Sequence, residues 1–135
     1  MYEIKVKSGF SAAHNLRNYR GKCENLHGHN WNIEALFAYK ELSKAGMAVD
    51  FKEAKRILES VLEKFDHSYL NETGAFKRLN PTSENMAKLI YDGIKKVNRY
   101  IASVSVWENE NSCATYRASL RGRSPKQSTK FSTKI

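Results

Sequence analysis

The chain has 135 residues, of which 41% are hydrophobic and 11% aromatic, so it is long enough to bury the core of one domain. No apolar run approaches the roughly 18 residues that a membrane span needs, and the opening stretch, MYEIKVKSGF, lacks the apolar region of a signal peptide. Two cysteines do not make a disulfide framework, so the composition indicates a cytoplasmic protein with no membrane partner.

The formal net charge of +9 is concentrated at the C-terminal end of the chain. Residues 117–135 hold six basic and no acidic residues, which leaves 17 basic against 14 acidic residues, a net charge of +3, before them. A basic, Ser/Thr-rich end is typical of a solvated, flexible tail. We therefore expect one domain over residues 1–117, a flexible tail over residues 118–135, and no nucleic-acid partner, since that role would rest on the tail alone.

Two segments near the N-terminus alternate apolar and polar residues with the period of two that is typical of half-buried strands. In the first, which starts at Tyr2, the even positions are mostly apolar and end with His14. In the second, residues 27–39, the apolar parity begins with His27 and His29. The polar stretch between them indicates a loop. Three of the four histidines are thus expected on the core-facing parity of two neighbouring strands.

The middle of the chain changes to helical spacing. Apolar residues recur every three to four positions over residues 51–65, after Asp50 as the expected N-cap. A second helix is expected to begin at Thr82 or Ser83 and to continue to about residue 97.

Two further strands are expected over residues 100–108 and 113–118, each rich in β-branched or aromatic residues. The order of elements is then strand, strand, helix, helix, strand, strand. This order predicts an α+β fold with a mainly antiparallel, four-stranded sheet and two helices on one face.

The histidine pattern predicts a metal site. His27 and His29 lie at i and i+2 on a strand, so their side chains project to one side, roughly 7 Å apart along the strand. His14, on the neighbouring strand, can supply a third imidazole. Three neutral imidazoles suit Zn2+ and leave a fourth position open, as in catalytic zinc sites. The alternative is that HGH forms a turn with solvated histidines, and the matching parity of three histidines favours the metal site.

Four more residues are candidates for the chemistry of this site. Cys23 could be a fourth metal ligand or a low-pKa acid or base. Asp66 and His67, near the end of the first helix, could face a common cavity, or they could be a charge pair that suits the helix dipole. Glu108 ends a strand on the apolar parity, so it needs a donor-rich ligand or a basic partner.

Five motifs in order along the chain resemble the 6-pyruvoyltetrahydropterin synthase / 6-carboxytetrahydropterin synthase family. They are FSAAHNL, CENLHGH, FDHSYLN, NPTSENMAKLI and WENENSCATY, and the match runs from about residue 1 to Arg117. The spacing Cys-x-x-x-His-Gly-His resembles the 6-carboxytetrahydropterin synthases of queuosine precursor synthesis, whereas animal-type pyruvoyl enzymes use a longer spacing. The basic tail departs from the short ending usual in the family.

The resemblance implies the tunnelling fold, with trimers whose sheets join into a barrel, two trimers stacked as a homohexamer, and active sites between subunits. It also implies a role for each candidate residue: zinc ligation by His14, His27 and His29, general base catalysis by Cys23, a proton relay by Asp66 and His67, and pterin binding by Glu108 with Thr82 and Ser83.

The implied reaction is the zinc-dependent conversion of 7,8-dihydroneopterin triphosphate to 6-carboxy-5,6,7,8-tetrahydropterin, with release of acetaldehyde and triphosphate. One alternative is a 6-pyruvoyltetrahydropterin synthase, which stops after triphosphate elimination. Another is an inactive zinc-binding assembly subunit. Arg17 and Lys22, in the loop near the expected zinc site, are weaker candidates for neutralising the triphosphate, and solvated side chains are the alternative there.

Overall fold

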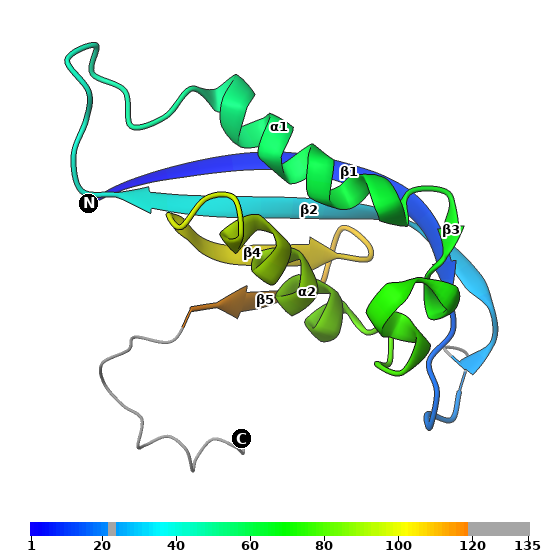
Figure 1. Ribbon diagram of the computed structural model, residues 1–135. Coiled ribbons are helices and arrows are strands. Elements are labelled where there is room, and N and C mark those ends of the chain that lie inside the picture. The colour runs from blue at the N-terminus through cyan, green and yellow to red at the C-terminus, as the bar shows by residue number, and fades with distance from the viewer. Residues whose placement is uncertain (22–23, 119–135) are drawn as a thin grey trace.

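The computed structural model describes residues 1–21 and 24–118. Two α-helices cover one face of a single sheet, which confirms the predicted α+β class (Figure 1). In chain order the helices and strands are β1 (Tyr2–His14), β2 (His27–Tyr39), α1 (Phe51–Leu62), β3 (Ser68–Tyr69), α2 (Ser83–Lys95), β4 (Ile101–Trp107) and β5 (Cys113–Arg117). Short 3-10 helices join α1 to α2: η2 (Glu63–Phe65), η3 (Leu70–Glu72) and η4 (Gly74–Lys77).

The sheet has the strand order β3-β1-β2-β4-β5 and therefore five strands, one more than the sequence predicts. The additional strand, β3, contains two residues and pairs in parallel with Ala12 and Ala13 of β1. A strand of two residues is too short to leave a period in the sequence. The other neighbouring pairs are antiparallel, and β1 and β2 pair along all of their 13 residues.

Both α-helices begin at residues whose side chains cap them, as the sequence predicts. The Asp50 carboxylate accepts a hydrogen bond from the Lys52 amide at 2.8 Å. Of the two candidates for the second helix, Thr82 is the cap, because its hydroxyl oxygen accepts from the Asn85 amide at 3.1 Å. These side chains satisfy backbone N–H groups that have no partner within the helix.

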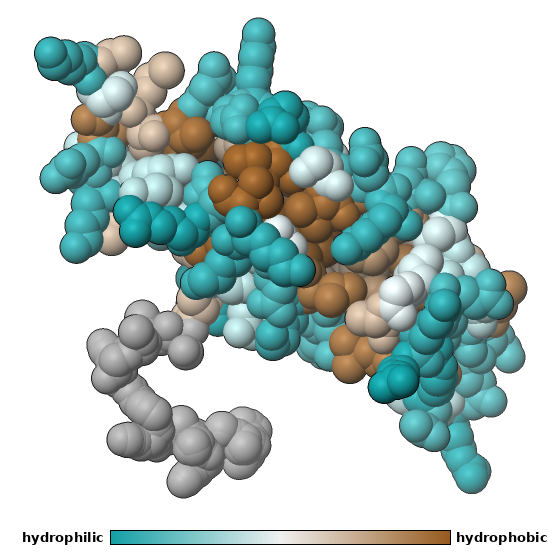
Figure 2. Space-filling model, in the orientation of Figure 1, coloured by the Kyte–Doolittle hydropathy of each residue, from teal (hydrophilic) through white to brown (hydrophobic). Residues whose placement is uncertain are grey.

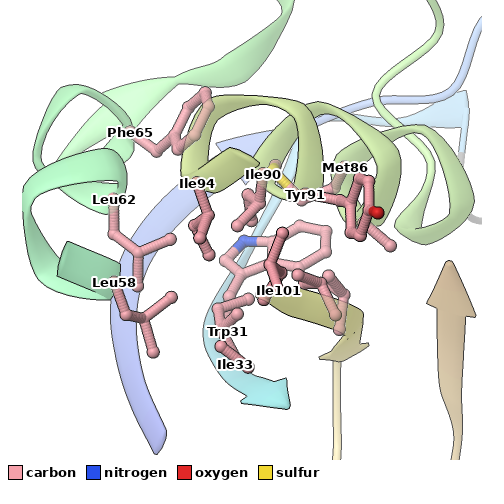
Figure 3. Packing of buried hydrophobic residues seen from close by; sticks show 14 of the residues in the cluster. Trp31, Ile33, Leu58, Leu62, Phe65, Met86, Ile90, Tyr91, Ile94 and Ile101 are labelled. Atoms are coloured by element: carbon pink, nitrogen blue, oxygen red, sulfur yellow. The ribbon is translucent and has the colours of Figure 1, made fainter. Parts of the chain in front are cut away.

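The hydrophobic core lies between the helices and the sheet. Figure 3 shows α1 and α2 directing apolar side chains toward Trp31 and Ile33 of β2, which are 1% and 0% exposed. Gly93 permits close contact between the helices, because a Cβ there would lie 3.1 Å from a methyl carbon of Val61. The outer surface of this layer is mostly hydrophilic, with hydrophobic groups showing between the polar side chains (Figure 2).

The opposite face of the sheet is polar. Glu34 of β2 lies 3.8 Å from the ammonium groups of both Lys5 and Lys7 on β1. Alternation along β1 and β2 therefore separates a buried face from a charged face, and both His14 and His29 lie on the parity of the buried residues. No helix among the described residues has the length and apolar character to cross a bilayer.

Candidate metal centre

The antiparallel register of β1 and β2 brings three histidines together at one end of the sheet. His14 lies opposite His27, and Ala12 lies opposite His29. The three rings have centroids 4.6–5.2 Å apart, and one nitrogen from each ring lies within 4.8 Å of the other two. The predicted convergence of these side chains is therefore present in the structure, and the group could bind a metal ion.

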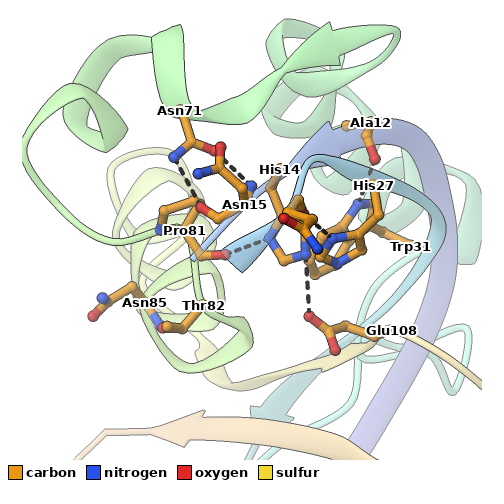
Figure 4. A network of polar contacts seen from close by, with 11 residues as sticks. Ala12, His14, Asn15, His27, Trp31, Asn71, Pro81, Thr82, Asn85 and Glu108 are labelled. Carbon is orange, nitrogen blue, oxygen red and sulfur yellow. Dashed lines mark hydrogen bonds and ion pairs between the residues drawn. The ribbon is translucent and has the colours of Figure 1, made fainter. Parts of the chain in front are cut away.

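Backbone carbonyl groups orient two of these imidazoles. Nδ1 of His14 lies 2.8 Å from the Pro81 carbonyl oxygen (Figure 4). Nδ1 of His27 lies 2.7 Å from the Asn25 carbonyl oxygen. A carbonyl oxygen only accepts hydrogen bonds, so each Nδ1 carries the proton and each Nε2 is left with a lone pair for a metal.

Burial also favours the neutral, ligating form of the rings. Nε2 of His14 and Nε2 of His29 are buried, and neither has a hydrogen-bond partner among the described residues. Burial lowers the pKa of His14 and of His29, against the opposing effect of Glu108. Unpartnered buried nitrogen atoms are costly in a folded protein. The residues thus fit a metal ion, and a set of three imidazoles is suited to zinc.

The Trp31 ring packs against the rings of His14 and His29, a role that was not predicted from the sequence. Its ring is 4.8 Å from that of His14 and 5.3 Å from that of His29, centroid to centroid. Its indole N–H donates to the Ala12 carbonyl at 3.2 Å, which fixes the ring in place. The only signal in the sequence is that Trp31 continues the parity of the two histidines on β2.

Glu108 follows directly after β4 and lies beside the histidines. Its Oε2 is 3.6 Å from Nε2 of His14, and its side chain is 32% exposed (Figure 4). The sequence predicts a carboxylate on the apolar side of the sheet, and the structure places it next to the candidate metal centre.

The N-terminus of α2 lies close by, because Pro81 contacts His14 immediately before the cap residue Thr82. Ser83 is the first residue of α2 and is partly buried. Both residues of the predicted binding pair therefore follow directly after the residue that contacts His14. The Thr82 hydroxyl oxygen already accepts the Asn85 amide, and its hydroxyl hydrogen has no assigned acceptor among the described residues.

Asp66 and His67 are close to each other but are not joined to the three histidines by any hydrogen bond or ion pair in the described part of the chain. The Asp66 carboxylate lies 3.1 Å from Nδ1 of His67 and accepts the Ser11 amide at 3.0 Å. The Ser11 amide is the main reason that the pKa of Asp66 is lowered. His67 has a left-handed backbone (φ 57°) and an 83% exposed side chain. The pair therefore faces outward, next to the β1 edge.

Arg17 holds the loop that follows β1. Its guanidinium donates to the carbonyl oxygens of Phe76 at 2.7 Å, Leu79 at 3.1 Å and Asn71 at 3.2 Å. These contacts give Arg17 a structural role, and its neutralising of a triphosphate stays a prediction. Lys22 and Cys23 lie outside the described residues, as does the tail from residue 119.

Comparison with known proteins identifies the family. The family model described as 6-pyruvoyl tetrahydropterin synthase matches residues 3–119. The chain belongs to this family. It is 37% identical over 114 residues to an Archaeoglobus fulgidus protein provisionally named 6-carboxy-5,6,7,8-tetrahydropterin synthase, a match that covers 84% of this chain and 94% of the relative. A Synechocystis protein named 6-carboxy-5,6,7,8-tetrahydropterin synthase is 34% identical over 122 residues, covering 86% of this chain and 93% of that one.

The solved structures agree with this family assignment. The structure of Caenorhabditis elegans 6-pyruvoyl tetrahydropterin synthase matches with a TM-score of 0.79 and 28% sequence identity, covering 87% of this chain and 96% of the other. The tunnelling fold implied by the motifs is thereby confirmed, and the chain is a member of this family by sequence and by fold.

Proposed function

We propose that the protein is a zinc-dependent lyase that converts 7,8-dihydroneopterin triphosphate to 6-carboxy-5,6,7,8-tetrahydropterin, with release of acetaldehyde and triphosphate. The observation that carries the proposal is the convergence of His14, His27 and His29 within a chain of this family. The relatives named 6-carboxy-5,6,7,8-tetrahydropterin synthase and the spacing of Cys23 from HGH support the carboxy product.

In this proposal the three histidines hold Zn2+ through Nε2 of His14 and of His29 and one nitrogen of His27. The Pro81 and Asn25 carbonyl groups keep two of the rings in the ligating tautomer. Zinc held by these residues would supply Lewis acidity, which would polarise oxygens on the substrate side chain and acidify the neighbouring C–H.

Cys23 is proposed as the base that removes the acidified proton. A thiolate near a cation has a lowered pKa, which makes it available for proton abstraction at neutral pH. Asp66 and His67 are proposed as the relay that activates the thiol or reprotonates the intermediate. Their contact at 3.1 Å supports a relay, since it holds the carboxylate and the imidazole within reach of a proton transfer.

Glu108 is proposed to bind the pterin, with help from Thr82 and Ser83. A carboxylate can accept two N–H bonds from the guanidine-like edge of the ring in a bidentate pair. The position of Glu108 beside His14 supports this role, because a pterin bound to this carboxylate would have its reacting side chain near the metal.

The proposed active unit is a homohexamer made of two stacked trimers, with the sites between subunits. Two features support this assembly. Among the described strands, only β3 pairs with the outer edge of β1, and it covers only Ala12 and Ala13. Asp66 and His67 lie beside this edge, with the His67 ring exposed, where another subunit could meet them.

Product analysis tests the proposal. Purified protein loaded with zinc and given 7,8-dihydroneopterin triphosphate should release acetaldehyde and triphosphate and form the 6-carboxy product. Triphosphate without acetaldehyde would identify a 6-pyruvoyltetrahydropterin synthase, the activity in the name of the Caenorhabditis elegans structure. Full zinc occupancy without either product would identify an inactive assembly subunit.

A further inference from the structure

The carboxylate of Glu108 approaches a ring nitrogen of the candidate metal ligand His14. Oε2 of Glu108 lies 3.6 Å from Nε2 of His14. Since Nδ1–H of His14 donates to the Pro81 carbonyl, Nε2 of the neutral ring directs a lone pair, not a proton, toward its surroundings. Two electron-rich atoms therefore lie near each other, and this arrangement is unfavourable unless a proton or a metal cation is shared between them.

A metal cation fits this position better than a proton. The 3.6 Å between the two atoms is longer than a hydrogen bond, and Nε2 of His14 has no hydrogen-bond partner among the described residues, so no proton is shared between them. Two ligand atoms that each lie about 2.0–2.1 Å from a tetrahedral zinc are separated by roughly 3.4 Å. The observed 3.6 Å between oxygen and nitrogen is close to that separation.

We propose that Glu108 is the fourth ligand of the metal in the pterin-free protein, and that it leaves the metal when a pterin binds. The second half rests on the proposed function, in which the same carboxylate accepts the N–H groups of the ring. Its 32% exposed side chain follows β4 directly, at the start of the turn to β5, so it has room to exchange between the two partners.

This exchange would couple the open position of the metal to the presence of substrate. While Glu108 is bound, the metal carries three imidazoles and a carboxylate, and solvent anions have no free position. Once a pterin takes the carboxylate, the fourth position becomes available to the oxygens of the substrate side chain. Glu108 would thereby determine which molecules reach the metal as well as how the ring is held.

Cobalt substitution tests the first half, because Co2+ occupies zinc sites and its visible spectrum reports on coordination. The visible spectrum of the full-length, Co2+-loaded protein is recorded without any pterin. Three proteins are compared: wild type, Glu108→Gln and Glu110→Gln. Glu110 is an exposed carboxylate two residues further along and controls for the loss of charge. We expect Glu108→Gln alone to change the spectrum and to weaken Co2+ binding by at least about tenfold, as removal of supporting groups around metals does.

Two results would contradict the assignment of Glu108 as a metal ligand. One is a Glu108→Gln protein whose spectrum and Co2+ affinity equal those of wild type. The other is a strong sulfur-to-cobalt charge-transfer band in the wild-type protein that Cys23→Ala removes, because Cys23 would then hold the fourth position. Glu108→Ala gives a second variant, with no side-chain oxygen at this position, and it should reproduce the spectral change of Glu108→Gln.

Pterin lacking the C6 side chain tests the exchange, since it offers the ring N–H groups but none of the side-chain oxygens. Adding it to the Co2+ wild type should move the spectrum toward that of Glu108→Gln, and it should leave the variant unchanged. A pterin that binds, by quenching of its fluorescence, without altering the wild-type spectrum would overturn the exchange. None of these spectroscopic measurements needs turnover. If the proposed reaction is wrong but the ligand exchange is right, the spectra change as expected and the product is missing.

Discussion

Nδ1 of His14 and the carbonyl oxygen of Pro81 lie 2.8 Å apart although 67 positions separate these residues in the chain. This hydrogen bond connects the end of β1 to the residue just before the cap of α2. The orientation of a candidate metal ligand thus depends on how α2 begins. The relationship can be tested through the cap.

Thr82→Ala should weaken both the fold and metal binding. Loss of the bond from the Asn85 amide should lower the free energy of unfolding by about 1 kcal/mol, and a shifted Pro81 carbonyl should lower zinc affinity by roughly tenfold. Asp50→Ala is the matched control, because it removes the cap of α1. It should cost similar stability and leave zinc affinity unchanged, and equal zinc loss in both variants would contradict the coupling.

His27→Ala and His29→Ala should each lose most of the bound zinc, because two imidazoles seldom hold zinc tightly. Elemental analysis of purified protein should give about one zinc per chain for wild type and much less for each variant. His67→Ala serves as the control and should retain its zinc, since the exposed His67 ring contacts Asp66 and not the other histidines. Unchanged zinc in the first two variants would remove them from the ligand set.

Cys23→Ala should show whether Cys23 acts as the base or as a metal ligand. If Cys23 is the base, the variant keeps its zinc and binds substrate, while turnover falls by roughly two to four orders of magnitude. Zinc content, substrate affinity and product formation are measured on the same preparation. Loss of zinc from this variant would instead make Cys23 a ligand.

Asp66→Asn should lower stability in a pH-dependent way. The Ser11 amide lowers the pKa of Asp66 in the folded protein, so this carboxylate stabilises the fold above its unfolded pKa of about 4. That contribution is lost as the pH falls through the lower folded value. The free energies of unfolding of wild type and variant should therefore differ at neutral pH and converge in acid. A difference that does not depend on pH would contradict ionisation as its cause.

Truncation after Ala118 should leave zinc content, assembly and turnover nearly unchanged. The described domain already contains the three histidines and Glu108, and its strand pairing ends at Ala118, whose amide donates to the Ala102 carbonyl at 3.2 Å. Sizing chromatography and the product assay measure the effect. Smaller species or lost activity would show that residues 119–135 belong to the working enzyme.

Most of the fold could be predicted because its elements are long enough to repeat a pattern. The period of two in β1 and β2 places His14 and His29 on the buried side before any coordinates are known. The two-residue strand β3 could not be predicted, since it has no period. It forms because the chain after η2 returns to β1, where the amide of His67 donates to the Ser11 carbonyl at 2.6 Å.

The site could be predicted in part, for a related reason. The histidines carry their chemistry in their side chains, so their spacing is visible in the sequence. The Pro81 and Asn25 carbonyl groups that orient them are backbone atoms, which every residue has and no pattern marks. The separation of 3.6 Å between Glu108 and His14 depends on how β4 pairs with β2, and this tertiary register is set by the packed core.

The pairing of His14 with His27 is the last rung of the β1–β2 ladder, next to the loop of residues 15–26. A metal bound there would fasten the two ends of that loop to each other, in the way that a crosslink restricts a chain. Chelation should then release this end of the hairpin first. Amide hydrogen exchange should accelerate at His14 and His27 while the amides of Val6 and Ala35, at the middle of the same ladder, remain protected. The metal would thus determine how often this end of the β1–β2 hairpin opens, in addition to its role in the proposed reaction.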